Sequence, residues 1–357
     1  ITTIELPASV TIIKEEVFRY CTSLVNIKTL SNVISIGEKA FANCTSLEDI
    51  GVLSSILNIE STAFANCTSL KSLVIENEME NIMGYAFSEC SSLTNVTINK
   101  IKTIAHSAFE YCSNLTTFNV AGIDIIEDYA FSYCSNLKAI NSLNGLTKIG
   151  SEAFSNCSSL TSIEIPSSVS IIGNNIFYNC SNLEKLTLPF VGKEDSIDGT
   201  LLYLFSLGAY NTNDIPSSLK EIVILDGCKN VGNYAFNDCK NITTISLPNS
   251  IVAIGNGAFK GCYSLANIKI PQSVKSIGAN TFDGCSSITS INIPNGLEKL
   301  GDSAFANCNN LVYNSYNDGK YLGNEANKYY VLISYPNTKE SVLIHDETKI
   351  IYSSAFA

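Results

Sequence analysis

The sequence predicts a repeat solenoid of parallel β-strands, and two observations carry that prediction. A Phe-x-x-Cys pair recurs along the 357 residues, and successive cysteines in the regular stretches are 22 or 23 residues apart. Each interval also holds a short apolar run that is rich in β-branched residues and alternates with period two. A fixed period of this length means that each coil packs only against its neighbours. We therefore expect about fifteen coils in a single domain over residues 1–357.

The interval Cys157–Cys180, CSSLTSIEIPSSVSIIGNNIFYNC, shows how one coil is built. Leu160, Ile163 and Ile165 predict a strand with one buried side. Pro166 ends that strand, because proline has no N–H group to donate to a further ladder bond. Stacking of the coils places equivalent strands side by side, about 4.8 Å apart, in a parallel sheet along one face.

The second half of the coil is predicted to return the chain along the opposite wall. Val169, Ile171 and Ile172 form a second apolar group, which Gly173 interrupts. A short helical turn then carries the Phe-Cys pair inward before the next strand begins. The predicted fold class is accordingly a right-handed superhelix, mostly β with short helical turns.

Twelve of the thirteen cysteines occupy one position per coil, and Cys228 is the exception. This periodicity indicates small, buried residues in an inward-facing ladder. Side chains in one ladder run parallel to each other, whereas the two halves of a disulfide must face each other. The pattern therefore favours reduced structural thiols, with bridges between adjacent coils as the alternative.

The first irregular coil covers residues 180–215. The interval Cys180–Cys239 is much longer than a regular coil, and Leu219, Ile222 and Ile224 mark a strand within it. This strand places Pro216 in the cysteine position, so the interval divides into coils of 36 and 23 residues. We expect the extra residues to form a loop, and loops of a solenoid often carry its function.

The second irregular coil covers residues 308–335. Aligning residues 344–356 with residues 165–177 places Pro336 in the cysteine position, so this coil is also longer than a regular one. It is rich in tyrosine, and its six tyrosines are Tyr313, Tyr316, Tyr321, Tyr329, Tyr330 and Tyr335. Two interpretations remain open for them: local packing of a hairpin, or exposure of at least two rings for recognition.

Tight protein interfaces usually need aromatic anchors, and such residues are scarce outside the two irregular coils. Outward positions of the regular strands are small and polar, as in the pair Asn95 and Thr97 or the pair Lys185 and Thr187. Aromatic anchors are therefore expected only in the two irregular coils. The candidate partner-binding residues are Phe190, Tyr203, Tyr210, Tyr313, Tyr316, Tyr321, Tyr329 and Tyr330.

The apolar segment LLYLF in the first irregular coil is too hydrophobic to remain exposed. Four of its residues are expected to pack inward, in place of the Phe-Cys turn that this coil lacks. They are Leu201, Leu202, Leu204 and Phe205.

The sequence gives little support for a catalytic site or for a bound cofactor. The two histidines, His106 and His345, lie about ten coils apart, roughly 48 Å at one strand spacing per coil. No nucleophile elbow, phosphate loop or zinc-protease motif occurs. Glu194, Asp195 and Asp198 lack the spacing of a calcium loop and are interpreted as a solvated acidic segment. We expect no enzyme activity, no cofactor and no metal site.

Charge and hydropathy exclude two further classes of partner. The net charge of −11 disfavours binding to nucleic acid or to anionic lipid. The sequence has no continuous apolar run long enough to span a bilayer, so membrane insertion is not expected. Its first residues lack the features of a signal peptide. Because the first and last coils are incomplete, we expect a piece of a longer protein whose signal and anchor lie elsewhere.

The unit C-x-x-L-x-x-I-x-I-P-x-S-V-x-x-I-G-x-x-A-F closely resembles the BspA-type leucine-rich repeat. Stretches such as CTSLKSLVI, IPQSVKSIGANTF and LPNSIVAIGNGAF carry this resemblance, which extends over essentially the whole chain. It implies a leucine-rich repeat solenoid that is secreted or attached to the cell surface. It also implies a source among mucosal bacteria or some protozoa, and a role in adhesion to host matrix, epithelium or other microbes. It supplies no binding residues.

The expected function is that of a non-enzymatic cell-surface protein. Its most favoured form is an adhesin that binds host extracellular-matrix or epithelial surface proteins through the irregular coils. One alternative is a passive stalk that presents another domain. Another is a glycan-binding module, in which tyrosine rings stack on sugar faces.

Overall fold

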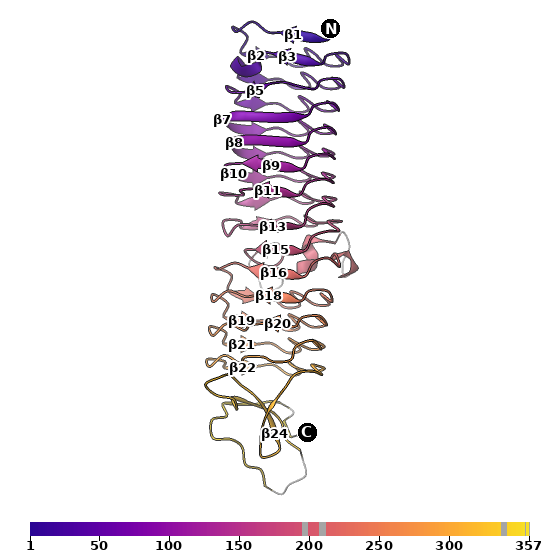
Figure 1. Cartoon of the computed structure of the whole chain (residues 1–357). Helices are drawn as coiled ribbons and strands as arrows, with labels where there is room; N and C mark the ends of the chain where they lie inside the picture. The colour runs from indigo at the N-terminus through magenta and orange to yellow at the C-terminus, as the bar shows by residue number, and fades with distance from the viewer. Residues whose placement is uncertain (195–198, 207–211, 337–340, 354, 357) are drawn as a thin grey trace. The chain divides into compact units, whose positions relative to one another are not determined.

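The computed structural model of the chain describes residues 1–194, 199–206, 212–336, 341–353 and 355–356. The chain forms two compact units. Unit 1 comprises residues 1–184 and 204–218, and unit 2 comprises residues 185–203 and 219–357. Each unit contains a stack of coils with parallel strands and very little helix, which confirms the predicted solenoid class (Figure 1). The single domain expected over the whole chain stays a prediction.

The first strand ladder of unit 1 follows the cysteine of each coil, as the sequence predicts. Ser72 pairs with Asn95, and Asn95 pairs with Thr117, so equivalent residues of neighbouring coils lie side by side. Leu73 and Ile75 point inward and are buried, while the residue between them is partly exposed. The strands at this position are β1 (Thr3–Glu5), β3 (Asn26–Lys28), β5 (Val52–Leu53), β7 (Ser72–Ile82), β8 (Asn95–Ile104), β9 (Thr117–Val120), β11 (Ala139–Asn141) and β13 (Ser162–Glu164).

The opposite wall of unit 1 is a second ladder of parallel strands. The sequence predicts only an apolar group there, and no second ladder. Ile172 is fully buried, but Ile171 is 44% exposed, because consecutive strand residues face opposite sides. Only Ile172 therefore joins the apolar wall at this strand. The C-terminal parts of β7 and β8 belong to this ladder, together with β2 (Ile12–Ile13), β4 (Ser35–Ile36), β6 (Asn58–Ile59), β10 (Ile123–Ile126), β12 (Lys148–Ile149) and β14 (Ile171–Ile172).

The turn that carries the Phe-Cys pair is not helical. Residues two before and two after the phenylalanine have positive φ, such as Tyr129 (58°) and Tyr133 (60°) around Phe131, and left-handed residues interrupt a right-handed helix. The N–H groups of Tyr129 and Tyr133 donate to Ser151 and Ser155 of the next coil, both at 2.9 Å. The turns thus form a third backbone ladder.

Helix is confined, within the described residues, to short 3₁₀ segments. They are η1 (Leu30–Asn32), η2 (Leu201–Leu204) and η3 (Thr212–Asp214).

The core between the walls is a stack of phenylalanines lined by cysteines. The rings of Phe109 and Phe131 lie 5.6 Å apart and 4° from parallel, and the same stacking links most neighbouring coils. Cys134 donates its thiol hydrogen to the carbonyl oxygen of Phe109, at 3.2 Å. All thirteen cysteines are free thiols. Burial raises the pKa of Cys44 to about 11 and that of Cys180 to about 12, so the ladder holds neutral thiols.

Unit 2 confirms the predicted length of the first irregular coil. Lys185 pairs with Glu221, 36 residues later, and Glu221 pairs with Thr244 after a further 23. The ladders of unit 2 consist of β15 (Lys185–Leu188), β16 (Glu221–Ile224), β18 (Thr244–Ser246) and β20 (Asn267–Ile268) on one wall, and of β17 (Asn230–Val231), β19 (Ala253–Ile254), β21 (Ser276–Ile277) and β22 (Lys299–Leu300) on the other.

The second irregular coil is an antiparallel meander and not an enlarged solenoid coil. β23 (Asn314–Tyr316), β24 (Gly319–Leu322) and β25 (Val331–Ser334) are antiparallel neighbours, and β26 (Ile350–Ile351) pairs in parallel with β25. Asn317 and Asp318 join the first two strands with φ of 46° and 68°. Two left-handed residues at a two-residue turn match the twist of a hairpin, which explains why the chain reverses here.

Candidate interaction surfaces

The apolar segment of the first irregular coil replaces the missing Phe-Cys turn. Leu201, Leu204 and Phe205 are fully buried, and Leu202 is half-buried. The N–H group of Phe177 donates to the carbonyl oxygen of Leu204 at 2.8 Å, and the ring of Phe205 lies 5.9 Å from that of Phe177. The predicted inward packing is confirmed for Leu201, Leu204 and Phe205, which are part of the core, whereas Leu202 is only partly buried.

The three candidate residues of this coil differ in exposure. Phe190 is buried, and Tyr203 is half-buried. Burial raises the pKa of Tyr203, and the nearby Glu194 carboxylate raises it further. Tyr210 lies outside the described residues. Binding through this coil stays a prediction, with Tyr203 as its best-placed described residue.

Two candidate tyrosines of the second irregular coil are core residues of the meander. Tyr321 is fully buried and packs in a cluster with Leu332, Tyr335 and Ala355. Tyr330 is buried, and its hydroxyl donates to the carbonyl oxygens of two solenoid residues, Asn295 at 2.7 Å and Leu297 at 3.1 Å. Their rings hold the meander together and leave little surface for a partner.

The remaining candidates of the meander are half-buried. The rings of Tyr329 and His345 stack at 4.0 Å, and Tyr316 meets His345 edge-on at 4.7 Å. Tyr313 lies near Lys320, whose Nζ is 5.8 Å from the ring centre. The structure therefore combines both interpretations of the coil, because a packed hairpin leaves three partly exposed tyrosines.

The outward face of the first ladder is mostly polar, as expected, with Val52 as an exposed exception. Ion pairs cross between coils, for example from Lys185 to Glu221 at 2.7 Å and from Lys71 to Glu48 at 2.5 Å. All four side chains are exposed, and such pairs contribute little to stability. Thr187 departs from the prediction, because it is buried.

A tyrosine-rich surface that the sequence interpretation missed lies on the turns of unit 1. We call it the turn wall, and it consists of residues 83–92, 105–114, 127–136 and 150–159. Tyr85, Tyr111 and Tyr133 are 41%, 45% and 43% exposed, and Tyr129 is half-buried. The expectation that aromatic anchors occur only in the irregular coils is therefore wrong.

Two aromatic rows run along the turn wall from coil to coil. In one, Tyr111 and Tyr133 stack with ring centres 4.6 Å apart. In the other, His106 meets Tyr85 and Tyr129 edge-on, at 5.3 and 5.4 Å. The Tyr85 hydroxyl lies 3.0 Å from His106 Nε2, and the Tyr129 hydroxyl donates to Glu152 at the same distance. Contact between neighbouring coils thus fixes the position of these side chains.

The backbone of these four tyrosines is strained. Each occupies one of the left-handed positions that flank the repeat phenylalanine, with φ between 58° and 61°. In other coils the position of Tyr111 and Tyr133 holds asparagine, which adopts this conformation at lower cost. These asparagines are Asn43, Asn66, Asn156, Asn179 and Asn307, and two further coils hold Glu89 and Asp238 there. That alternation of Asn and Tyr at one position is the signal by which the sequence could have identified the surface.

The turn wall is also acidic. Its carboxylates are Glu89, Glu110, Glu127, Asp128 and Glu152, and its four segments contain no lysine or arginine. The pKa of Tyr111 is raised by burial and by three acidic neighbours: the Tyr133 hydroxyl and the carboxylates of Glu110 and Glu89. The pKa of Tyr129 is raised by its hydrogen bond to Glu152, by burial and by the charges of Glu152, Asp128 and Glu110.

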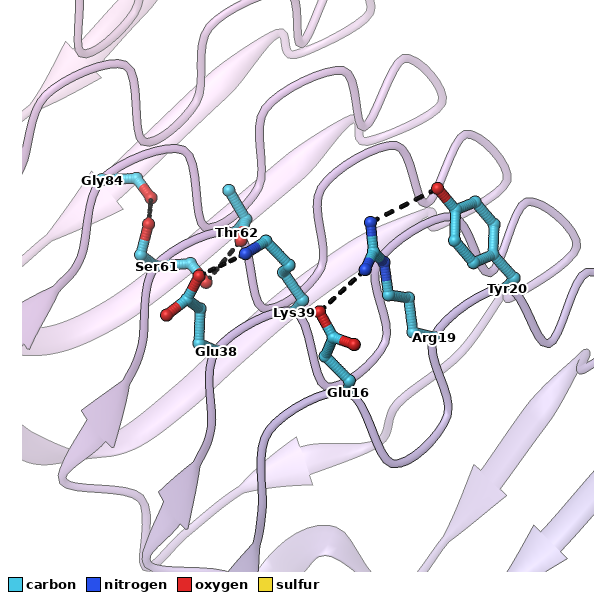
Figure 2. Close-up of polar contacts among 8 residues, drawn as sticks. All are labelled: Glu16, Arg19, Tyr20, Glu38, Lys39, Ser61, Thr62 and Gly84. Carbon is cyan, nitrogen blue, oxygen red and sulfur yellow. Dashed lines mark hydrogen bonds and ion pairs between the residues drawn. The ribbon is translucent and has the colours of Figure 1, made fainter.

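The turns that precede the turn wall carry positive as well as negative charges. Arg19 donates from Nη1 to Glu16 at 2.7 Å and from Nη2 to the Tyr20 hydroxyl at 3.4 Å, and both contacts are drawn in Figure 2. Its guanidinium carbon lies 4.8 Å from the centre of the Tyr20 ring. Lys39 pairs with Glu38 beside a depression of about 430 Å³. Glu16 and Glu38 are therefore each paired with a cation, whereas the carboxylates of the turn wall have no lysine or arginine in their own segments.

Two kinds of feature are absent from the part of the chain that the structure describes: clusters of metal-ligating side chains and membrane-spanning helices. No cluster of three or more metal-ligating side chains occurs among those residues, and Asp195 and Asp198 of the acidic segment lie outside them. None of the described helices has the length and apolar character needed to cross a bilayer.

Comparison with known proteins finds matches of sequence and of fold. A family model for the BspA type leucine rich repeat region, in six copies, matches residues 1–116, 102–198 and 213–332. A solved leucine-rich repeat protein from Bacteroides ovatus is 27% identical, with a TM-score of 0.51, over 98% of this chain and 91% of that one. A search of curated proteins gives no match.

Two further solved structures are similar at lower identity. A leucine-rich cell surface protein from Faecalibacterium prausnitzii is 24% identical, with a TM-score of 0.40, over 100% of this chain and 90% of that one. A leucine-rich repeat protein from Eubacterium ventriosum is also 24% identical, with a TM-score of 0.37, over 80% and 82%.

Proposed function

The chain belongs to the BspA-type leucine-rich repeat family, and from this membership we propose that it is a non-enzymatic adhesin, secreted or attached to the cell surface. Membership indicates a role in protein interaction. The proposal goes further, since it assigns host extracellular-matrix or epithelial surface proteins as partners. The observation that carries it is the turn wall, where the rings of Tyr85, Tyr111 and Tyr133, from three successive coils, are each more than 40% exposed.

Tyrosines are effective anchors because a ring supplies a large contact area with few rotatable bonds. The turn imposes this left-handed backbone in every regular coil, since Lys39, Thr62 and Glu152 adopt it as well. The asparagines of other coils show that the fold does not require tyrosine here, so the rings are free to serve recognition. The half-buried Tyr203, Tyr316 and Tyr329 are proposed as secondary contacts of the irregular coils.

The test is binding of the purified chain to immobilised matrix proteins and to epithelial cells. The informative variant carries Tyr111→Asn and Tyr133→Asn, because asparagine suits the left-handed backbone and removes only the rings. Tyr20→Asn is the matched control, since Tyr20 occupies the equivalent position of another coil. We expect saturable binding that the double variant loses and the control retains.

A passive stalk gives a different result. It requires that neither the native chain nor any variant binds, even at tens of micromolar, a range in which weak specific contacts are still detected. Unaltered binding by the double variant would instead move the contact to the irregular coils. A Tyr203→Ser, Tyr316→Ser variant tests these, and it leaves the buried Leu204 and Phe205 untouched.

A further inference from the structure

Tyr20, Tyr111 and Tyr133 occupy the same repeat position, two residues after the phenylalanine, but their surroundings differ. Tyr20 already has a cation on its ring, because Arg19 lies over it and is held by Glu16 (Figure 2). This arrangement of carboxylate, guanidinium and tyrosine ring is a favourable one, since the cation meets a negative charge and the negative face of an aromatic ring.

The turn wall has two components of that arrangement and lacks the third. The residue before Tyr111 is Glu110, and the residue before Tyr133 is Ser132, where Tyr20 has Arg19. The charged groups that act on Tyr111 are carboxylates, and no lysine or arginine occurs in the four segments of the wall. The exposed rings and the carboxylates around them are therefore not neutralised within their own turns.

We infer that the turn wall binds an arginine-rich, extended segment of a protein partner. The guanidinium groups of that segment lie on the outer faces of the stacked Tyr111 and Tyr133 rings, and the one on Tyr111 also pairs with the carboxylates of Glu89 and Glu110. This assignment rests on the proposed function and names the chemistry of its partner.

The spacing of the rings sets the spacing of the arginines. The ring centres are 4.6 Å apart, and a group stacked on each outer face adds about 3.5–4 Å per side. The two guanidinium groups are then roughly 12 Å apart, which an extended chain spans in three or four residues at about 3.3 Å each. Arginine is preferred to lysine, because its planar group stacks on a ring and pairs with a carboxylate at the same time.

The first experiment titrates the full chain into a fluorescent peptide of four Arg-Ser-Gly repeats and follows anisotropy. The control peptide replaces every arginine by citrulline, which keeps the shape and hydrogen-bonding plane but carries no charge. We expect the arginine peptide to bind at least about tenfold more tightly, and its affinity to fall severalfold when salt is raised tenfold, because exposed charges are screened.

Protein variants locate the site. Tyr111→Asn with Tyr133→Asn should weaken binding of the arginine peptide at least about tenfold, as should Glu89→Gln with Glu110→Gln, because each removes one component of the arrangement. Tyr20→Asn should leave the affinity within about twofold, because Arg19 already occupies that ring. Thermal melts show whether each variant is folded. If the Tyr111→Asn, Tyr133→Asn variant is unfolded, the Glu89→Gln, Glu110→Gln variant provides the test.

Three outcomes overturn the inference: equal binding of the citrulline peptide, unchanged affinity in both double variants, or no peptide binding. If the chain still binds matrix proteins and the arginine peptide fails to compete, the partner chemistry is wrong and the adhesin stands. If the chain binds neither the peptide nor any matrix protein, the adhesin fails as well. Competition by soluble mucin oligosaccharides alone would assign the rings to sugars.

Discussion

The turn wall of unit 1 and the meander of residues 314–334 are both rich in tyrosine, yet they use it in opposite ways. On the turn wall the rings of Tyr111 and Tyr133 project from left-handed positions and remain more than 40% exposed. In the meander Tyr321 is fully buried, and Tyr329 packs against the cluster around it. One region presents its tyrosines, and the other is held together by them.

The position of a tyrosine within the coil, and not its residue type, decides whether its ring is exposed. Each regular coil fills its core with phenylalanine and cysteine, so a tyrosine two residues away has no inward space to occupy. The last cysteine of the sequence, Cys308, lies before the meander. The tyrosines of the meander therefore supply the apolar volume that the Phe-Cys pair supplies in the regular coils. The predictions below separate the two regions by the groups that hold each together.

Alkaline pH should have the largest effect, and it should act on the coils before the meander. A thiol in the unfolded chain has a pKa of about 8.5, whereas burial raises that of Cys44 to about 11 and that of Cys180 to about 12. Below pH 8.5 both states hold the proton, and stability is unaffected. Above it the unfolded chain loses protons that the folded coils keep, so the free energy of unfolding falls by about 1.4 kcal/mol per pH unit for each thiol.

Urea unfolding between pH 7 and pH 10, under reducing conditions, measures this effect. The ladder acts collectively, so the coils should unfold before pH 10 while remaining stable between pH 7 and pH 8. A Cys134→Ala, Cys157→Ala variant has two thiols fewer. Its free energy of unfolding should therefore fall by about 3 kcal/mol less per pH unit than that of the native chain. A stability that stays flat up to pH 10 would contradict the buried thiol ladder.

Tyr321→Ala should have the next largest effect, and it should be confined to the meander. The side chain is fully buried against Leu332, Tyr335 and Ala355, so its removal leaves a cavity and costs about 3–5 kcal/mol. Hydrogen exchange across residues 314–334, read by mass spectrometry, measures the local loss. Tyr321→Phe is the control, which keeps the ring and should cost about 1 kcal/mol or less. A loss below about 1 kcal/mol for the alanine variant would mean that the cluster is loosely packed.

The fold was predictable because the sequence repeats its burial pattern. Leu160, Ile163 and Ile165 predict a strand in one coil, and the same spacing in neighbouring coils makes the pattern unmistakable. The length of the first irregular coil was predictable for the same reason, since the strand at Leu219 had to align with the ladder. A packed hairpin was one of the two interpretations that the sequence left open for the second irregular coil, and its strand order became clear only with the left-handed backbone at Asn317 and Asp318.

The exposed tyrosines were missed because their positions are defined by backbone conformation and not by apolar pattern. A tyrosine beside the repeat phenylalanine adds to the apolar count of the segment and is easily attributed to the core. The left-handed φ turns Tyr111 and Tyr133 outward, and it is visible in the sequence only through the asparagines that occupy the same position in other coils. The kind of partner depends on the charges around these tyrosines. Tyr20, which has Arg19 beside its ring, shows what Tyr111 and Tyr133 lack.

Replacing Tyr111 and Tyr133 by asparagine should have the smallest effect on stability, although it should abolish binding. The loss of the stacked pair costs about 0.5–1.5 kcal/mol, and relief of the left-handed backbone at two sites returns roughly the same amount. The net change in urea unfolding should therefore stay within about 1 kcal/mol, against the roughly 3–5 kcal/mol of Tyr321→Ala. Alanine at the same two sites separates the contributions, because it loses the rings and keeps the strain, and it should be less stable than the asparagine variant by about 1 kcal/mol or more. If asparagine proves as damaging as alanine, with a loss well beyond what the stacked pair alone can account for, the rings of the turn wall serve the fold itself and the contrast with the meander disappears.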